Sequence, residues 1–456
     1  MRKPLSPILF ALLVGLIGPG GVSAQSRYAD LDAAVQEVLD RGVSGSLHGL
    51  GASVHLPDGT IRSYGAGVRR AGEPIDTTRA FFFASYTKML TSVVLLQLVD
   101  EGSVSLDAAV NDVVATVPNV PADETLRSLL QHRSRLGLYL GSALQAVQQH
   151  PDSVFETRST LAAHLAPANR NAARGFDYND SNFQVAGLVA EELTGVPGGD
   201  LFESRIFGPA GADFAELAPS QPDTDRINGA WVNGSVDVGA VNPAGFLSAS
   251  RYAAGVLGTT RDMLKVLVAL HSGTFLRPET LALMQTGSTA NASYGLGMMS
   301  RQYGGFRLYG HGGGLVHSSR TFFDPVNLIG VSVAANEDTD LIEQLMVDLF
   351  AAVRANPVSV SVEGGVDLVA GWSLEAYPNP AVGQASVAVE VPRAGVTRVM
   401  LFDLLGRKRL GVFSGNVEAG SHRFGLDVAD LASGVYVLRM EGAGESVTRV
   451  VIVGGR

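Results

Sequence analysis

The chain has 456 residues, of which 46% are apolar and 54 are glycine, and its formal net charge is -10. This composition is typical of globular, turn-rich domains, and the length predicts two or three of them. The acidic charge disfavours nucleic acid and anionic membrane surfaces as partners. The absence of cysteine excludes disulfide stapling, a catalytic thiol and a cysteine-linked lipid anchor.

Residues 1–24 have the pattern of a secretory signal peptide. Arg2 and Lys3 precede an apolar run over residues 8–17, and Val22 and Ala24 form a small-residue cleavage pattern. The run is shorter than the roughly 20 residues that span a bilayer, so we expect cleavage and no membrane span in the mature chain. Loss of the two positive charges would take the net charge from -10 to -12.

Helical and strand-like stretches alternate over residues 27–355. Strands are predicted at 49–56, 320–325 and 329–336, the last two forming a hairpin around Asn327. Helices are predicted directly after Ser85 and at 125–132, 184–195 (C-cap Gly195), 259–273 (N-cap Thr260) and 342–355. Strands at both ends with helices between them predict an α+β domain whose sheet gathers from both termini.

The stretch FFFASYTKML (81–90) places a serine three residues before a lysine. Ser85 and Lys88 would share one face of the helix that follows, which is apolar nearly all round and therefore buried. Burial lowers the pKa of a lysine and makes it a candidate general base. The motif predicts a nucleophile with its proton acceptor, although the same residues also fit a surface N-cap serine beside a solvated lysine.

Two later clusters contain further candidate groups. GFDYNDSNF supplies Tyr178 and Asp180 before a helix, and YGHGGGLVHSS contains His311. Taken singly, the first fits a half-buried aromatic residue and the second a turn. No metal or other cofactor is expected, because the nine histidines are scattered without a His-Glu-x-x-His motif. The absence of Gly-x-Ser-x-Gly disfavours an α/β-hydrolase.

With its three motifs in this order, the region resembles the serine hydrolases related to class C β-lactamases, penicillin-binding DD-peptidases and the corresponding esterases. Those enzymes carry Ser-x-x-Lys, Tyr-x-Asn and Lys-Thr-Gly or His-x-Gly, and YGLGM (294–298) is a weaker similarity. The resemblance implies a β-lactamase/transpeptidase-like fold, an antiparallel sheet with a helical cluster. It also implies that Ser85 forms an acyl-enzyme while Lys88 and Tyr178 share the proton as general base and later as acid.

The resemblance further implies the groups that contact the substrate. The backbone N–H groups of Ser85 and Gly314 would form the oxyanion hole, where Gly313 and Gly314 permit a close backbone approach. Asp180 would align Lys88 and the substrate. His311 would stand in the third motif, where its neutral form at pH 7 favours esters or uncharged amides over carboxylate-bearing penicillins and D-Ala-D-Ala peptides. Peptidoglycan peptides stay open as substrates.

Several positions depart from the family pattern. After His132, a structural residue by expectation, Arg133 and Arg135 replace small residues, so the loop is expected to be rebuilt. Asp180 replaces the common asparagine and should hold Lys88 protonated. His317 lies where a glycine is expected, so the strand edge beside the substrate is expected to differ.

Residues 356–372 are predicted to be a linker, and residues 373–456 an all-β, immunoglobulin-like sandwich with strands at 385–391, 398–406, 422–428, 434–440 and 447–453. This region resembles the C-terminal sorting domain of proteins exported by the type IX secretion system. The residues that carry the resemblance are YPNP at 377–380, residues 403–407 and SGVY at 433–436. A carbohydrate-binding or adhesive module is the alternative.

Together these observations predict a serine hydrolase exported through the periplasm to the cell surface or medium, with the type IX machinery as partner of residues 373–456. Its expected substrate is a small-molecule or peptidoglycan-like ester or amide, with esterase, D-Ala-D-Ala carboxypeptidase and β-lactamase-like activities all open. The alternatives are a catalytically inactive member that binds cell-wall peptides and a surface adhesion protein.

Overall fold

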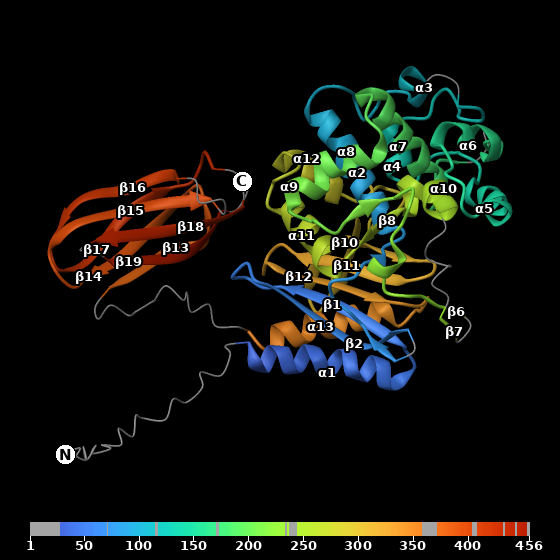
Figure 1. Cartoon of the computed structure of the whole chain (residues 1–456). Coiled ribbons are helices and arrows are strands. Elements are labelled where there is room, and N and C mark those ends of the chain that lie inside the picture. The colour runs from blue at the N-terminus through green and yellow to red at the C-terminus, as the bar shows by residue number, and fades with distance from the viewer. Residues whose placement is uncertain are drawn as a thin grey trace, which may run out of the picture.

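A computed structural model describes residues 28–70, 72–114, 117–169, 173–232, 235–236, 244–357, 372–403, 408–431, 434–442 and 445–453. The predicted signal peptide and residues 358–371 of the predicted linker lie outside this part of the chain. A mixed α/β region extends to residue 357, and an all-β region begins at residue 372 (Figure 1).

The first region is built on a seven-stranded antiparallel sheet with the strand order β3-β2-β1-β12-β11-β10-β9. Its strands are β1 (Gly49–His55), β2 (Ile61–Arg70), β3 (Glu73–Pro74), β9 (Met299–Tyr303), β10 (Phe306–Gly314), β11 (Ser318–Asp324) and β12 (Ile329–Ala335). Pairing of β1 with β12 joins the two ends of the region, which confirms that the sheet gathers from both termini. The predicted hairpin is also confirmed, because β11 and β12 pair around Asn327.

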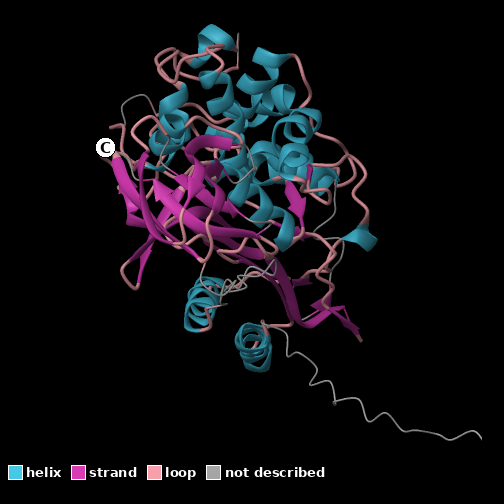
Figure 2. Ribbon diagram, turned by 90° about the vertical axis from the view of Figure 1, so that its left-hand side faces the viewer, coloured by secondary structure: helices cyan, strands magenta, loops and turns pink. Residues whose placement is uncertain are grey.

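Two helices cover one face of this sheet, and the remaining helices lie on the other (Figures 1 and 2). Helices α1 (Ala29–Gly45) and α13 (Ile342–Ala355) pack against each other and against the strands. Their apolar sides, with Leu31, Val35, Met346 and Phe350, form one core with the inward residues of the strands. Such amphipathic helices are stabilised mainly by the burial of their apolar stripe.

The other face carries α11 (Thr260–His271) and a helical cluster. The cluster comprises α2 (Tyr86–Asp100), α3 (Val110–Val113), α4 (Leu126–Leu130), α5 (Leu140–Gln149), α6 (Thr157–His164), α7 (Asp180–Thr194), α8 (Gly198–Phe202), η1 (Glu203–Phe207), α9 (Gly208–Ala210), α10 (Ala244–Ala254) and α12 (Pro278–Gln285). Within the described ranges, no helix has both the length and the apolar character needed to cross a bilayer.

Short strands and one further turn complete this region. A three-stranded sheet has the order β4-β8-β5, with β4 (Phe81–Phe82), β8 (Val256–Gly258) and β5 (Glu216–Leu217). Strands β6 (Trp231–Val232) and β7 (Ser235–Val236) form a hairpin, and η2 (Thr224–Arg226) is a single 3₁₀ turn.

The predicted helices are present, but α7 begins at Asp180 and not at residue 184 as predicted, because Asn179 caps it. Gly195 ends α7 in the left-handed conformation with a φ of 67°, as predicted. The predicted N-cap of α11 is wrong by one residue: Thr259, not Thr260, accepts a hydrogen bond from the backbone of Asp262 and forms a capping box with it. Either of the two adjacent threonines could cap a helix by its residue type. Only Thr259 has the extended backbone conformation of an N-cap residue, because the helix begins at Thr260.

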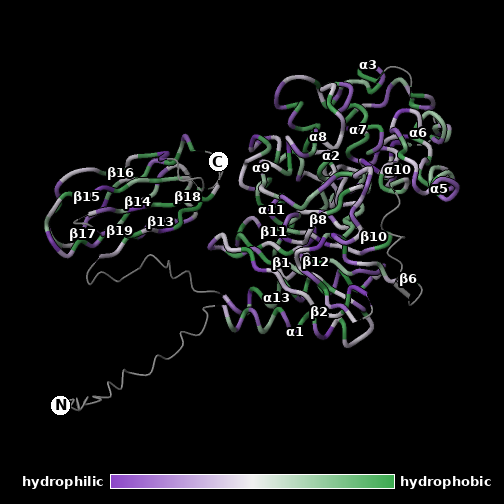
Figure 3. The backbone as a smooth tube through the Cα atoms, in the orientation of Figure 1, coloured by the Kyte–Doolittle hydropathy of each residue, from purple (hydrophilic) through white to green (hydrophobic). Residues whose placement is uncertain are grey.

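The second region is a seven-stranded, all-β unit with the order β16-β15-β18-β19-β13-β14-β17. Its strands are β13 (Ser373–Val382), β14 (Gln384–Val391), β15 (Gly395–Asp403), β16 (Lys408–Val417), β17 (Gly420–Asp427), β18 (Gly434–Gly442) and β19 (Glu445–Val453). Strand β13 pairs with β14 along its first half and meets β19 at Ala381, as in a small sandwich. Along β14, buried residues alternate with more exposed ones, and hydropathy alternates in the same way (Figure 3). Strands β13 and β16 were not predicted.

Candidate active site

Ser85 is the N-cap of α2 and is separated from the short strand β4 by Phe83 and Ala84. The residue before it, Ala84, has a φ of 44°, a left-handed conformation that is costly for a residue with a Cβ. Neighbouring bonds hold this turn, because the Phe83 N–H donates to the carbonyl of Val256 at 3.0 Å and the Thr87 hydroxyl donates to the carbonyl of Ala84 at 2.7 Å. The turn leaves Ser85 half-buried at the start of an otherwise buried helix.

Lys88, one turn further along α2, is fully buried and surrounded by three oxygens. Its Nζ donates to Ser85 Oγ at 3.0 Å and to the carbonyl of Ala253 at 3.0 Å, and lies 2.6 Å from Asp180 Oδ1. An ammonium has three N–H donors and no acceptor, so this arrangement satisfies all of them. Lys88 therefore stands as an ammonium that donates to the serine, without a lone pair to receive its proton.

The pKa of Lys88 also favours the ammonium form. Burial lowers it, but the charges of Tyr178 and Asp180 and their hydrogen bonds outweigh burial, and the pKa is raised above its ordinary value of 10.5. This direction runs against the expectation that burial makes Lys88 a free-amine base, and it agrees with the expectation that Asp180 holds Lys88 protonated.

Tyr178 and Asp180 come from the loop before α7 and the first residue of that helix. Asn179, the N-cap, accepts a hydrogen bond from the Ser181 N–H at 2.9 Å, which determines where the helix begins. Asp180 follows in the first turn, where a carboxylate is favoured by the helix dipole. The Tyr178 ring is 39% exposed, and its centroid lies 4.9 Å from Lys88 Nζ.

The third motif lies on β10, beside the nucleophile. A Cβ added to Gly313 would lie 2.1 Å from the carbonyl oxygen of Phe83 and 3.0 Å from the Cβ of Ala84, so only glycine lets the strand approach this closely. Gly314 is exposed at the end of the strand. The Ser85 N–H stands before the first helical turn, where donors lack intrahelical acceptors.

His311 differs from the expectation of a substrate-lining residue. Its side chain is fully buried: Nε2 faces the hydroxyl of Tyr294 at 3.2 Å, and Nδ1 lies 2.6 Å from the carbonyl of Gly312. Burial lowers its pKa to about 3, so the ring is neutral. The structure thus places His311 behind the site, with both ring nitrogens already in hydrogen bonds.

Of the two arginines after His132, Arg135 pairs with a buried carboxylate and Arg133 with a backbone carbonyl. Glu124 is fully buried and accepts hydrogen bonds from Arg135 Nε at 2.9 Å and Arg174 Nη1 at 2.7 Å. Arg133 donates to the carbonyl of Arg174 at 3.2 Å through both Nε and Nη2. These contacts fasten the segment that leads to Tyr178.

His317 is a structural substitution. Its fully buried ring accepts a hydrogen bond from the Phe82 N–H at 3.0 Å through Nδ1 and packs edge-on against Phe81, with centroids 5.6 Å apart. It therefore joins the turn after β10 to β4, the strand that leads into Ser85.

Sequence reasoning missed Tyr294, which lies between His132 and His311 in the buried floor. The signal was the tyrosine of YGLGM, which a single sequence does not distinguish from an ordinary core residue.

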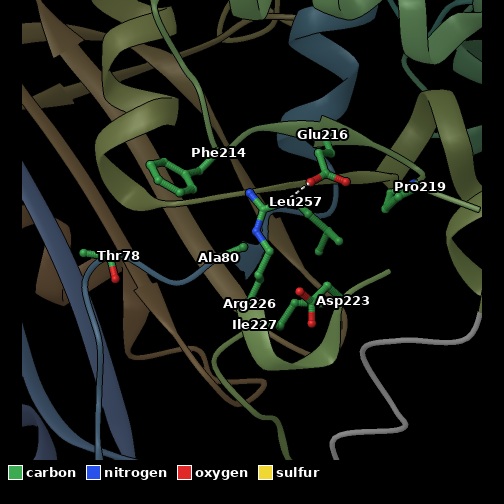
Figure 4. A pocket seen from close by; sticks show the side chains of 9 residues that line it. All are labelled: Thr78, Ala80, Phe214, Glu216, Pro219, Asp223, Arg226, Ile227 and Leu257. Carbon is green, nitrogen blue, oxygen red and sulfur yellow. Dashed lines mark hydrogen bonds and ion pairs between the residues drawn. The ribbon is translucent and has the colours of Figure 1, made fainter. Parts of the chain in front are cut away.

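A small pocket lies at the edge of the β4-β8-β5 sheet (Figure 4). Its most polar groups pair with each other, because Arg226 Nη1 donates to Glu216 Oε1 at 2.8 Å. None of the residues predicted to be catalytic lines it. The pocket is lined by Thr78, Ala80, Phe214, Glu216, Pro219, Asp223, Arg226, Ile227 and Leu257.

Comparison with known families gives two matches. Residues 31–350 match the Beta-lactamase family, and residues 375–454 match the Secretion system C-terminal sorting domain. The first match covers most of the chain and contains every residue proposed for catalysis.

Individual relatives are more distant. A D-aminopeptidase of Brucella anthropi is 30% identical over 242 residues, which are 51% of this chain and 44% of that protein. The esterase EstB of Burkholderia gladioli is 26% identical over 299 residues, or 57% and 74% of the two chains. The chain thus spans less than half the length of the D-aminopeptidase.

Among solved structures, the D-amino acid amidase of Ochrobactrum anthropi SV3 in complex with D-phenylalanine has a TM-score of 0.62 at 22% identity. The match covers 72% of this chain and 99% of that one. At this identity the likeness shows a shared fold.

Proposed function

Because the chain belongs to the Beta-lactamase family and is a serine hydrolase that works through an acyl-enzyme, we propose that it hydrolyses esters and amides whose acyl group carries no carboxylate. The observation that carries the proposal is the ammonium of Lys88, held by Ser85, Ala253 and Asp180. No cation of the three motifs is left free to pair with a substrate carboxylate within the described residues.

In the proposed reaction, Ser85 Oγ attacks the carbonyl carbon and its proton passes to the phenolate oxygen of Tyr178. Lys88, as an ammonium, cannot take that proton but lowers the cost of the phenolate and of the developing alkoxide. The N–H groups of Ser85 and Gly314 would stabilise the oxyanion. Tyr178 then gives the proton to the leaving group as the bond to carbon breaks, and water attacks the acyl-enzyme by the reverse sequence.

Charges around the nucleophile support the choice of substrate. Asp180 is a partly exposed carboxylate beside Lys88, and His311 is neutral and buried. A substrate carboxylate would meet like charge here without a compensating cation, whereas a neutral or ammonium-bearing acyl group would not. The names of the relatives, a D-aminopeptidase, an esterase and a D-amino acid amidase, agree with this class.

Residues 375–454 form a secretion sorting domain, and we propose that it delivers the hydrolase to the cell surface or medium through the type IX machinery. Export would begin with the predicted signal peptide and pass through the periplasm. An inactive cell-wall-binding protein or an adhesin is the alternative, and the assembled Ser85, Lys88 and Asp180 disfavour both.

The test is a substrate panel with wild type, Ser85→Ala and the control Ser103→Ala, an exposed serine after α2. p-Nitrophenyl butyrate and D-phenylalanine amide represent the proposed class, while nitrocefin and a D-Ala-D-Ala peptide carry carboxylates. We expect turnover of the first two, and a loss of at least about a thousandfold in Ser85→Ala alone. Fastest turnover of nitrocefin would contradict the substrate class, and no Ser85-dependent phosphonate adduct would contradict the enzyme.

A further inference from the structure

Three buried polar rings next to Tyr178 are joined in one line of hydrogen bonds. His132 follows α4, Tyr294 precedes β9 and His311 lies within β10, and each is at most 3% exposed. The hydroxyl of Tyr294 is 3.1 Å from His132 Nε2 and 3.2 Å from His311 Nε2. A single oxygen therefore joins two imidazoles from distant parts of the sequence.

The direction of each hydrogen bond in this line follows from its two ends. The backbone N–H of Asn179 can only donate, and it lies 3.1 Å from His132 Nδ1, so that nitrogen carries no proton. The carbonyl of Gly312 can only accept, and it lies 2.6 Å from His311 Nδ1, so that nitrogen is protonated. His132 Nε2–H must then donate to Tyr294, whose hydroxyl donates to His311 Nε2.

Both imidazoles are suited to this neutral arrangement. Burial lowers the pKa of His132 well below 6.5, with the charge of Lys88 acting in the same direction. Burial likewise lowers the pKa of His311. Because Tyr294 satisfies one nitrogen on each ring, its removal would leave a donor and an acceptor without partners in a dry interior.

At one end of the line, His132 forms hydrogen bonds to the backbone N–H groups of the residues before and after Tyr178. His132 accepts from the Asn179 N–H through its ring and from the Asp177 N–H at 2.8 Å through its carbonyl. Its ring also packs against the Tyr178 ring, with centroids 4.2 Å apart. A left-handed φ of 52° at His132 is strained and persists only where surrounding contacts impose it.

The other end of the line belongs to the strand beside the nucleophile. His311 is two residues before Gly313, which packs against the carbonyl of Phe83 just ahead of Ser85. The line therefore spans the space between the loop that carries Tyr178 and the strand of the expected oxyanion hole.

We propose that Tyr294 is a positioning residue that sets the orientation of Tyr178 for proton transfer, by connecting His132 to His311. The inference rests on the proposed role of Tyr178 as base and acid. An amide needs a proton from Tyr178 as its C–N bond breaks, because the amine leaves as a neutral molecule. A p-nitrophenyl ester needs Tyr178 only as the base in the attack by Ser85, because p-nitrophenolate leaves as an anion when the C–O bond breaks.

This difference distinguishes positioning from simple structural support. The experiment compares D-phenylalanine amide with the p-nitrophenyl ester of D-phenylalanine, which share one acyl group, in wild type and Tyr294→Phe of the full chain. Rates are divided by the concentration of Ser85 that a phosphonate probe labels. We expect kcat/KM for the amide to fall about 100-fold, as for a catalytic group misplaced by about 1 Å. We expect kcat/KM for the ester to fall less, because the ester uses Tyr178 as base but not as acid.

Tyr139→Phe is the matched control, because that buried hydroxyl donates to the carbonyl of Ala249, away from the line. It should lower the melting temperature without changing the amide-to-ester ratio. If Tyr294→Phe does not fold, His132→Asn breaks the same line while keeping an oxygen for the Asn179 N–H, and should change the ratio in the same direction. Equal losses on amide and ester would overturn the inference. Hydrolysis that survives Ser85→Ala would instead overturn the proposed function.

Discussion

Acid should weaken the first region through His317, a buried imidazole outside the proposed chemistry. Burial lowers its pKa from 6.5 to about 3. Below about pH 6.5 the unfolded chain binds a proton that the folded chain does not accept until about pH 3, so the free energy of unfolding falls as pH falls through this window. The stabilisation from the neutral ring is present above about pH 6.5 and is lost on acidification.

The size of the effect follows from the two pKa values. At about pH 4.5 the unfolded imidazole is almost fully protonated and the folded one almost fully neutral. Two pH units below 6.5, at about 1.4 kcal/mol per unit, give a loss of about 2 to 3 kcal/mol between pH 7 and pH 4.5. A typical domain is stable by only about 5 to 15 kcal/mol, so one residue has a measurable share.

The assay is urea unfolding at pH 7 and pH 4.5, with and without His317→Asn, in a Trp372→Phe background. The chain has two tryptophans, and this background leaves Trp231 to report on the first region alone. Asparagine retains an oxygen acceptor for the Phe82 N–H but does not titrate. We expect the variant to be less stable at pH 7 and to lose about 2 to 3 kcal/mol less than the parent on acidification. Equal losses would refute the reasoning, because His317 would then not be held neutral.

Two substitutions test the site itself. Gly313→Ala should lower kcat/KM by about 100-fold or more, because its Cβ would meet the carbonyl of Phe83 at 2.1 Å. Gly314→Ala, whose Cβ finds only ordinary contacts of 3.5 Å or more, should lose much less; the reverse order in ester assays would contradict the placement of β10. Asp180→Asn should lower the pKa of Lys88 and move the alkaline loss of kcat/KM toward neutral pH. A pH profile that overlays wild type would show that Asp180 does not set the charge of Lys88.

Features that depend on local sequence were predicted well. The Ser85 to Lys88 spacing on a buried helix was recognised, and α13 begins and ends at the predicted residues. Strands with continuous apolar runs, such as β12, were also found. The residue pattern of FRLYGHGGG does not predict strand β10, because it contains no β-branched residue, and only the family resemblance implied a strand at His311. The conformation comes from pairing with β9 and β11.

In the candidate site, too, local sequence predicted some features and tertiary contacts decided others. Sequence alone named Ser85, Lys88, Tyr178 and Asp180, because each stands in a short motif with a fixed local spacing. It left the charge of Lys88 open, since burial and a nearby carboxylate shift its pKa in opposite directions. The charges and hydrogen bonds of Tyr178 and Asp180 resolve that competition, and both residues lie far from Lys88 in the sequence.

Sequence by itself therefore identified the candidate nucleophile, its candidate acidic partner and the division into a hydrolase region followed by a β-rich region, because these depend on residue type, short motifs and local periodicity. Only the tertiary structure decided that His311 lies behind the site, that Arg135 neutralises the buried Glu124, and that Tyr294 joins two histidines. Each of these is a contact between residues from separate segments, and its geometry exists only after the sheet and the helical cluster have packed together.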